Sequence, residues 1–492
     1  MPRLTVLVKP LLLINIICSW TSFAIETHKI SKDTREIKVG IIGGGIGGTA
    51  TAAFLKEAFQ DDILLHIFEP NKVGGRLSTS QNFDDEYETG GSIIHPQNEY
   101  MNYFVHVLGL KKSHGCPSKF GIFDGKDYLF TQSDWYFMNV IKFFWRYGLD
   151  IYRLNSLNDN MLSSFSRIYD LQKQGTSFKN VQDLLGALDP NFVPLLNKTT
   201  RSYLKELNFG DLIIDELVTA CTRTNYGQSP DINAFVGSVS VAGASPDLWS
   251  VVGGNKRVPE ELIKYSKAIL IEDIVTKISR NEDGKFRVFH KPPRAKFGSE
   301  IEQHTDYDAV VIATPLTKDV SFIEFLNFSK PFYFPGRYEK IISTLVEGEL
   351  NEITFKTKTE GLNIEEILTN NISLPYNSVG KQVSVSKDCN STHKIYKVFS
   401  PDTLTNDQLS HLFNKIVKVE EKQWLAYPHY SEDKFNGQFE LVPGLYYNNA
   451  IEQAASAMEM SAISAKNSAL LVEKYIKKID STDNPRENKD EL

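Results

Sequence analysis

Residues 37–69 carry the clearest hydrophobic pattern in the chain. An apolar run, IKVGII, leads into glycines at positions 43, 45 and 48, which are followed by the small-residue stretch TATAAFLKEAF and a second apolar run, ILLHIFE. The two short apolar runs predict buried strands, and the stretch between them predicts a helix. The order strand, glycine turn, helix, strand is typical of the first half of a dinucleotide-binding Rossmann-type fold.

Further along, the pattern changes between helical and strand character. Residues 131–230 read mainly as helices, as in FKNVQDLLGAL and FGDLIIDELVTAC. AILIEDIVTKISR, KFRVFH and TDYDAVVIATPL then predict strands, and EKIISTLVEG belongs to a strand-rich region at 330–430. A last helix is expected to start near Ser456–Met458. The returning strands indicate that the domains interleave along the chain.

The segment at 133–152, SDWYFMNVIKFFWRYGLDIY, is unusually rich in aromatic residues. Its large apolar side chains extend nearly around a helix of little more than three turns. We therefore predict a helix that is buried on most sides or lines an apolar cavity. Core packing is the favoured interpretation, because aromatic side chains mostly fill cores.

The glycine turn has a specific chemistry. Gly43 permits a tight turn, Gly45 lets the backbone approach a pyrophosphate, and Gly48 lets the helix lie close to the sheet. The N-terminus of the helix offers N–H groups to the phosphates. Glu69 follows Gly48 at the spacing expected of an acid that binds ribose hydroxyl groups. Together these residues predict a dinucleotide site.

Two later glycine turns favour FAD over NAD. The GGR element containing Gly75 and Arg76 follows the second strand, and the turn Gly90-Gly91-Ser92 comes soon after it. Both resemble the FAD fold of flavin amine oxidases, which implies that the first approaches the pyrophosphate and the second passes close to the flavin. Near the C-terminus, a strand meets a turn containing Glu452, and Met458 begins a helix whose N-terminus would stabilise reduced flavin.

We therefore predict an α/β protein in which a Rossmann-type FAD-binding domain is interleaved with an α+β substrate domain. FAD-binding parts are expected at 37–100, 231–320 and 436–475. The substrate domain takes a mainly helical part at 101–230 and an α+β part at 321–435. Residues 476–492 are expected to form an acidic tail. No metal site is predicted.

Composition and the two ends of the chain indicate a compartment. The net charge of −7 and the lack of a long basic run argue against nucleic acid as a partner. Residues 1–24 predict a cleaved secretory signal peptide, and no later segment is a predicted membrane span. Lys489–Leu492 reads KDEL, which predicts the KDEL receptor as a partner and residence in the endoplasmic reticulum lumen. Four N-x-S/T sites are candidate glycosylation sites: Asn197, Asn327, Asn371 and Asn390.

The cysteines allow at most one disulfide in a chain that has lost its signal peptide. Cys18 leaves with the signal, so that Cys116, Cys221 and Cys389 remain and one thiol is left over. Cys116 and Cys221 are not spaced as CxxC, and a redox pair between them is discounted.

Several segments resemble the prenylcysteine oxidase family, over about residues 38–473. The shared glycine motifs are GGGIGG and VGGR, and the more specific segments are YETGGSIIHP, WSVVGGNKRVP and LYYNNAIEQAASAMEMSAISAKNSALL. The resemblance implies a fold similar to flavin amine oxidases and FAD-dependent cleavage of farnesyl- or geranylgeranyl-cysteine. The products would be cysteine, a prenyl aldehyde and hydrogen peroxide, with oxygen as acceptor, as part of prenylated-protein breakdown.

This family assignment leaves the details of the site open. The hydride chemistry needs no strong base, and Lys256 and His95 are weak catalytic candidates. Phe144 and Trp145 are weak candidates for an apolar pocket that takes the prenyl chain. Two alternative functions are a luminal flavin amine oxidase and a non-catalytic prenyl-binding flavoprotein. Family members are usually lysosomal, so the lysosome is the alternative location.

Overall fold

The structure is a computed structural model that describes residues 36–116, 118–244, 247–293, 302–356, 363–386, 393–430 and 436–483. The predicted signal peptide, the sequon at Asn390 and the KDEL terminus lie outside the described residues.

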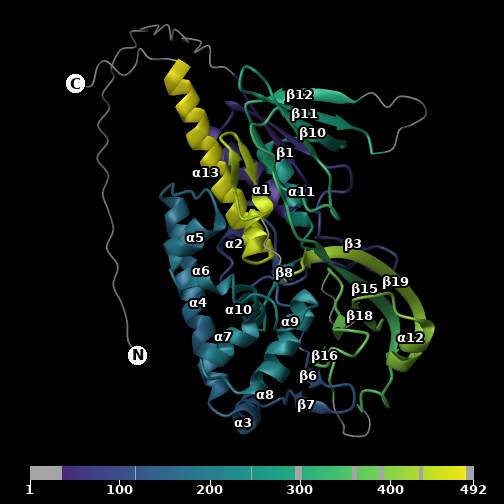
Figure 1. Ribbon diagram of the computed structural model, residues 1–492. Helices are drawn as coiled ribbons and strands as arrows, with labels where there is room; N and C mark the ends of the chain where they lie inside the picture. The colour runs from purple at the N-terminus through teal and green to yellow at the C-terminus, as the bar shows by residue number, and fades with distance from the viewer. Residues whose placement is uncertain are drawn as a thin grey trace, which may run out of the picture. The chain divides into compact units, whose positions relative to one another are not determined.

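A six-stranded sheet carries the predicted dinucleotide fold (Figure 1). Its order is β20-β21-β13-β1-β2-β9, and β21, β13, β1, β2 and β9 run parallel. The strands are β1 (Ile37–Ile42), β2 (Ile63–Phe68), β9 (Ile269–Ile271), β13 (Ala309–Ile312), β20 (Glu440–Val442) and β21 (Leu445–Tyr447). They come from all three chain segments predicted to build the FAD-binding domain. The Rossmann-type α/β prediction is therefore confirmed.

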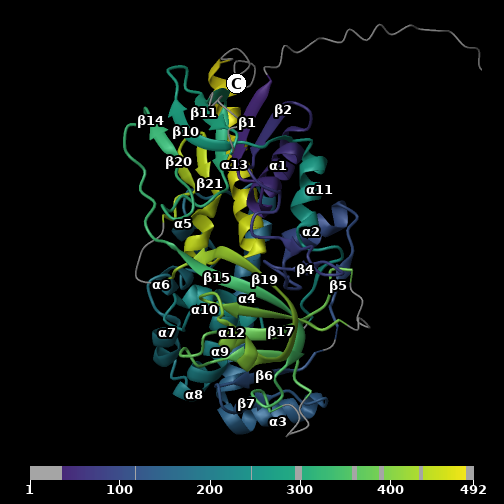
Figure 2. The same cartoon turned by 90° about the vertical axis from the view of Figure 1, so that its right-hand side faces the viewer.

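Helices and a second sheet pack on this sheet. α1 contacts both α11 and α13, and its buried residues at 48–53 are small, which allows close approach. The helices are α1 (Ile46–Phe59), α11 (Arg257–Ser266) and α13 (Met458–Asp483). A four-stranded sheet in the order β12-β11-β10-β14 contacts β1 through β12 (Figure 2). Its strands are β10 (Ile274–Arg280), β11 (Phe286–Lys291), β12 (Gln303–Tyr307) and β14 (Glu324–Leu326).

A seven-stranded sheet in the order β19-β15-β18-β17-β16-β6-β7 forms the rest of the β structure. Its strands are β6 (Phe120–Phe123), β7 (Tyr128–Thr131), β15 (Tyr338–Leu350), β16 (Glu366–Thr369), β17 (Ser378–Gln382), β18 (Ile395–Ser400) and β19 (Phe413–Pro428). Strands β6 and β7 come from the segment predicted as mainly helical. Helix α12 (Asn406–Leu412) packs on β19, and two short strand pairs lie outside the large sheets: β3 (Thr79–Ser80) with β4 (Tyr87–Glu88), and β5 (Lys112–Ser113) with β8 (Ser250–Val251).

Most helices of the substrate part lie between 101 and 230, but α10 (Ala234–Ala242) lies beyond the predicted limit of 230. The helices of this part are α2 (Glu99–Val107), α3 (Tyr136–Tyr147), α4 (Asp150–Lys173), α5 (Val181–Leu188), α6 (Phe192–Leu195), α7 (Thr200–Glu206), α8 (Asp211–Ile213), a π-helical turn at Ile214–Val218, α9 (Thr219–Tyr226) and α10. A short 3₁₀ helix, η2 (Asn448–Gln453), precedes α13. Among the described residues, no helix combines the length and apolar character needed to cross a bilayer, and no cluster of His, Cys, Asp and Glu could hold a metal ion.

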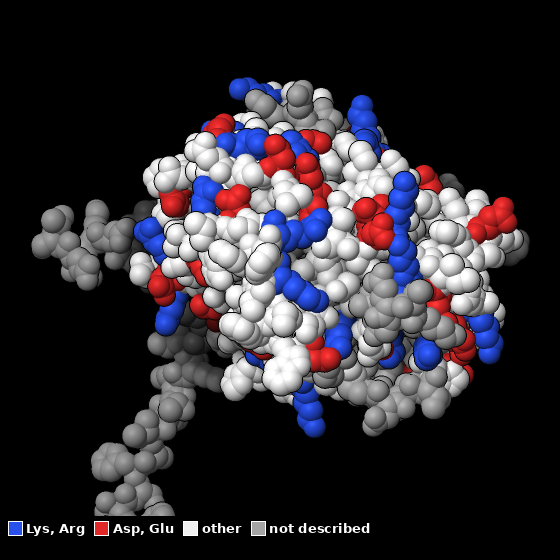
Figure 3. All heavy atoms as spheres, turned by 90° about the horizontal axis from the view of Figure 1, so that it is seen from below, with Lys and Arg blue, Asp and Glu red and all other residues white. Residues whose placement is uncertain are grey.

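Helix α3 departs from its prediction. Phe143 stacks on Phe130 of β7 and Tyr147 is buried, but Trp145 is 84% exposed and Phe144 is 44% exposed. The helix lies at the lower end of Figure 1, and uncharged side chains make up much of the surface seen from that side in Figure 3. The prediction of burial on most sides is wrong, because only one face of this apolar helix is covered by neighbours. Exposed apolar surfaces of this kind are typical of interaction sites.

The C-terminal helix also extends beyond its predicted end. α13 continues to Asp483, and Ile476 is buried in the core. The acidic tail therefore does not begin at 476 as predicted.

Candidate cofactor and substrate site

The turn after β1 requires glycine at two positions. Gly43 has a φ of +115°, and a Cβ there would lie 2.7 Å from the carbonyl oxygen of Ala313, which follows β13. A Cβ on Gly48 would collide with the carbonyl oxygen of Gly43. These contacts give the physical reason for the first and third glycines of the motif, and they bring the ends of β1 and β13 together at the N-terminus of α1.

A second glycine turn faces this N-terminus. Gly74 N donates to Gly44 O at 3.0 Å, and a Cβ built on Gly45 would lie 3.7 Å from Gly75 Cα. Gly45 precedes α1 and has no side chain that could cap its first N–H groups. The two turns therefore form a cradle of bare backbone beside a positive helix end, which fits a pyrophosphate.

Glu69 follows β2 and lies beside the cradle. It is 8% exposed, and its carboxylate accepts hydrogen bonds from Gly44 N at 2.9 Å and from Asn71 N at 3.0 Å. A carboxylate has about four acceptor positions, so these two bonds leave capacity for ribose hydroxyl groups. The residues present therefore fit a dinucleotide.

Arg76 and Glu452, both predicted to bind the cofactor, form an ion pair with each other. Arg76 also donates hydrogen bonds to Ala426 O at 2.9 Å and to Ser456 Oγ at 3.2 Å. The hydroxyl group of Tyr338 donates a hydrogen bond to the Glu452 carboxylate. Burial alone would lower the pKa of Arg76, but Glu452 more than offsets this and raises the pKa above its usual value. The guanidinium is therefore permanently charged.

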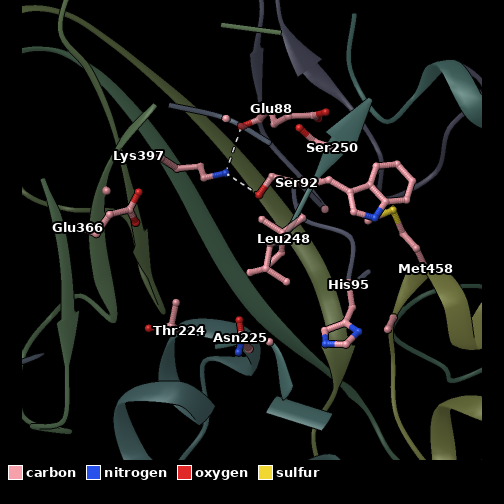
Figure 4. A pocket seen from close by; sticks show the side chains of 18 of the residues that line it. Glu88, Ser92, His95, Thr224, Asn225, Leu248, Ser250, Glu366, Lys397 and Met458 are labelled. Atoms are coloured by element: carbon pink, nitrogen blue, oxygen red, sulfur yellow. Dashed lines mark hydrogen bonds between the residues drawn. The ribbon is translucent and has the colours of Figure 1, made fainter. Parts of the chain in front are cut away.

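A cavity of about 920 Å³ adjoins this cluster (Figure 4). Of the predicted cofactor residues, Gly90, Gly91, Ser92 and Met458 line it. Phe144 and Trp145 are not among its lining residues, so their prediction as pocket residues is wrong, and the reason is the outward-facing surface of α3.

The two weak catalytic candidates have different environments. His95 lines the cavity, its Nδ1 accepts a hydrogen bond from Gln97 N at 3.2 Å, and burial lowers its pKa. Lys256 is not among the lining residues, and its Nζ donates to Thr79 Oγ1 at 2.7 Å and to Glu86 at 2.8 Å. The geometry gives His95 access to a ligand and gives Lys256 a role in holding β3 and β4.

Six charged residues that line the cavity were not predicted: Glu88, Glu365, Glu366, Lys381, Lys397 and Glu459. Glu459 lies in the first turn of α13, where its carboxylate accepts hydrogen bonds from the first N–H groups of α2 and from Tyr169 Oη. Burial raises its pKa to about 7 although these bonds oppose the shift. In the sequence, Glu459 could have been noticed as the one acidic residue inside the small-residue segment AMEMSAIS.

Cys116 is disulfide-bonded, whereas Cys221 is a buried free thiol whose pKa burial raises to about 12. Those two cysteines therefore do not form a pair with each other, as expected.

Of the described sequons, Asn197 and Asn327 are exposed and Asn371 is half-buried, with its side-chain amide donating to Asp124 O at 2.9 Å.

Solved structures share this fold. Cyclohexylamine oxidase from Brevibacterium oxydans has a TM-score of 0.59 at 16% identity, covering 90% of this chain and 100% of that one. A putrescine oxidase double mutant has a TM-score of 0.59 at 14% identity, covering 90% and 99%. At these identities the likeness establishes the fold alone.

Sequence comparisons establish the family. The model for an NAD(P)-binding Rossmann-like domain matches residues 41–108, and the prenylcysteine lyase model matches residues 130–484. Prenylcysteine oxidase 1 of Homo sapiens is 40% identical over 453 residues, covering 88% of each chain. Prenylcysteine oxidase 1-like of Bos taurus is 34% identical over 452 residues, covering 89% of this chain and 91% of that one. This chain therefore belongs to the prenylcysteine lyase family.

Proposed function

We propose that this chain is an FAD-dependent thioether oxidase that cleaves prenylcysteine to cysteine, a prenyl aldehyde and hydrogen peroxide. Family membership carries this proposal, because relatives called prenylcysteine oxidase 1 match 88% of this chain at up to 40% identity. The reaction consumes one oxygen molecule and one water molecule for each thioether cleaved.

The cradle residues would hold the cofactor. Gly45 and Gly75 would face the pyrophosphate, Glu69 the ribose, and the turn containing Ser92 the flavin end of the cavity. The chemistry that FAD supplies when bound is acceptance of a hydride from the allylic carbon beside sulfur and transfer of the electrons to oxygen. Addition of water and loss of the thiol then complete the conversion.

The chain supplies orientation and an apolar environment. Leu162 and Phe165 of α4 and Val239 of α10 are among the apolar residues that line the cavity. A farnesyl chain has fifteen carbons, and at about 0.8 kcal/mol per buried CH₂ its burial could contribute on the order of 10 kcal/mol before ordering costs. Affinity can therefore come mainly from the lipid.

Anaerobic mixing tests the proposal. Farnesylcysteine should bleach the flavin absorbance of the purified protein, and admission of air should restore it with release of peroxide. If the flavin stays oxidised with farnesyl- and geranylgeranyl-cysteine but bleaches with an amine, the chain is an amine oxidase. If neither bleaches it, the chain is a prenyl-binding flavoprotein without catalytic activity.

We also propose residence in the endoplasmic reticulum lumen, with the KDEL receptor as partner. The signal-like segment 1–24 and the motif at Lys489–Leu492 support this, and exposed Asn197 and Asn327 are suitable glycan acceptors. Deletion of the last four residues should send the protein to lysosomes or the medium. An unchanged location would contradict a role for the motif.

A further inference from the structure

Two oppositely charged side chains lie on one side of the cavity. Glu366 of β16 and Lys397 of β18 both line it, and Figure 4 shows them on the side away from His95 and Met458. Lys397 is 5% exposed and Glu366 is half-buried. Burying a charged side chain costs free energy, and a ligand group of opposite charge would offset part of that cost.

The strand register brings the two residues together around one glycine. Gly380 of β17 pairs with Glu366 on one side and with Lys397 on the other, so both side chains stand on the same face of the sheet. Their backbones are two strand spacings apart, which is about 10 Å. A Cβ on Gly380 would lie 2.9 Å from Glu366 Oε2, so the carboxylate occupies the space above this glycine.

The neighbouring groups link this pair to the predicted flavin side of the cavity. Lys397 Nζ donates to Glu88 O at 3.3 Å and to Ser92 Oγ at 3.5 Å, in and beside the glycine turn predicted to face the flavin. Glu366 accepts a long hydrogen bond of 3.4 Å from Ser118 Oγ. Burial raises the pKa of Glu366 to about 7, and the nearby Lys397 opposes that shift.

We propose that Glu366 and Lys397 bind the zwitterionic head of a free α-amino acid, with Glu366 pairing with its ammonium and Lys397 with its carboxylate. This inference rests on the proposed function and names how that same site recognises its substrate. The head group would then lie beside the turn containing Ser92. The thioether is a few bonds away, and the prenyl chain would extend toward α4 and α10.

Crossed binding measurements test the two roles separately. The probes are S-dodecylcysteine, S-dodecylcysteamine, which lacks the carboxylate, and 3-(dodecylthio)propionate, which lacks the ammonium. Their saturated chains have no allylic carbon, so calorimetry on the flavin-loaded protein reports binding alone. Glu366→Gln should weaken binding of the first two probes about tenfold to a hundredfold and leave the third unchanged. Lys397→Met should weaken the first and third and leave the second unchanged.

Two further variants guard against effects on folding. Gly380→Ala keeps both charges and displaces only the flexible end of Glu366, so it should fold normally and reproduce the Glu366→Gln pattern. Lys340→Met is the control, because Lys340 lies on β15 of the same sheet, pairs with Asp402 and is not among the lining residues of the cavity. Its binding of all three probes should equal that of the wild type.

The outcomes separate this inference from the proposed function. If Glu366→Gln and Lys397→Met bind all three probes like the wild type, or weaken all three equally, the head-group assignment is wrong. Farnesylcysteine oxidation by the wild type is measured independently. If the wild type does not oxidise farnesylcysteine, the proposed thioether oxidase activity is wrong. The binding results with the three probes would still decide the head-group assignment.

Discussion

Replacement of Arg76 by methionine tests whether its pair with Glu452 supports the cofactor site. The Glu452 side chain is 2% exposed and that of Arg76 is 33% exposed. Methionine would remove the ion pair and the hydrogen bonds to Ala426 and Ser456. The carboxylate would remain buried, with neutral donors on Tyr338 and Asn449.

The burial of the ion pair sets the expected loss of stability in Arg76→Met. Removal of one partner of a buried ion pair costs about 3–5 kcal/mol, because the other charge stays desolvated. Since Arg76 is one-third exposed, we expect about 3 kcal/mol, which corresponds to a fall in Tm of roughly 3 °C for a chain of this length. The double variant Arg76→Met, Glu452→Gln should lose less than the sum of the single variants, because neither charge is then left alone.

Thermal unfolding and flavin content are the assays. Arg76→Met should unfold at lower temperature and retain less flavin than the wild type. Lys179→Met is the control, because Lys179 is 66% exposed in its pair with Glu440 and exposed pairs contribute about 0–1 kcal/mol. If Arg76→Met behaves like this control, or if the single effects add in the double variant, the reasoning about the buried pair is refuted.

Three further predictions follow from the described contacts. Gly45→Val should fill the cradle facing Gly75 and yield protein without flavin, so a yellow variant with full occupancy would contradict the pyrophosphate assignment. The raised pKa of Glu459, about 7 against an ordinary 4.5, favours its protonated form in the fold. Its contribution to stability is therefore full below about pH 4.5 and falls by on the order of 3 kcal/mol as pH rises through about 7. Melting curves at pH 5 and 8 should show a flatter dependence for Glu459→Gln, and equal slopes would count against this. Trp145→Ser, at an 84% exposed position, should change the free energy of unfolding by less than about 0.5 kcal/mol and leave the KM for farnesylcysteine unchanged; a raised KM would restore the pocket role.

The dinucleotide fold could be predicted because its constraints are local. Gly43 is favoured by its own positive φ, Gly48 by its contact with Gly43 O in the same turn, and the spacing to Glu69 follows from one strand and one helix. The aromatic helix α3 could not be placed in the same way. Composition shows that a helix is apolar, but not which of its faces other elements cover.

The contacts of the charged residues of the site could not be predicted either, because they join residues that are far apart in the sequence. Arg76 and Glu452 were each predicted as cofactor residues, yet their pairing joins positions 376 residues apart. Glu366 and Lys397 meet only through the register of three strands around Gly380, which no local pattern encodes. Lys256 follows a Gly-Gly turn as predicted, but its contacts with Thr79 and Glu86 depend on the distant β3–β4 pair.

The interleaved sheet has a consequence for the order of events during synthesis. The first strand made, β1, pairs with β13, and the neighbouring bond from Lys38 N to Asp308 spans 270 residues. At about 5–20 residues per second, a ribosome needs roughly 15–50 s to supply that partner. Asn448 of η2 then donates to Thr51 of α1 across 397 residues. The two turns of the glycine cradle are thus among the first parts to be translated, whereas β1 and α1, which hold them, gain these partners only after most of the chain has been made.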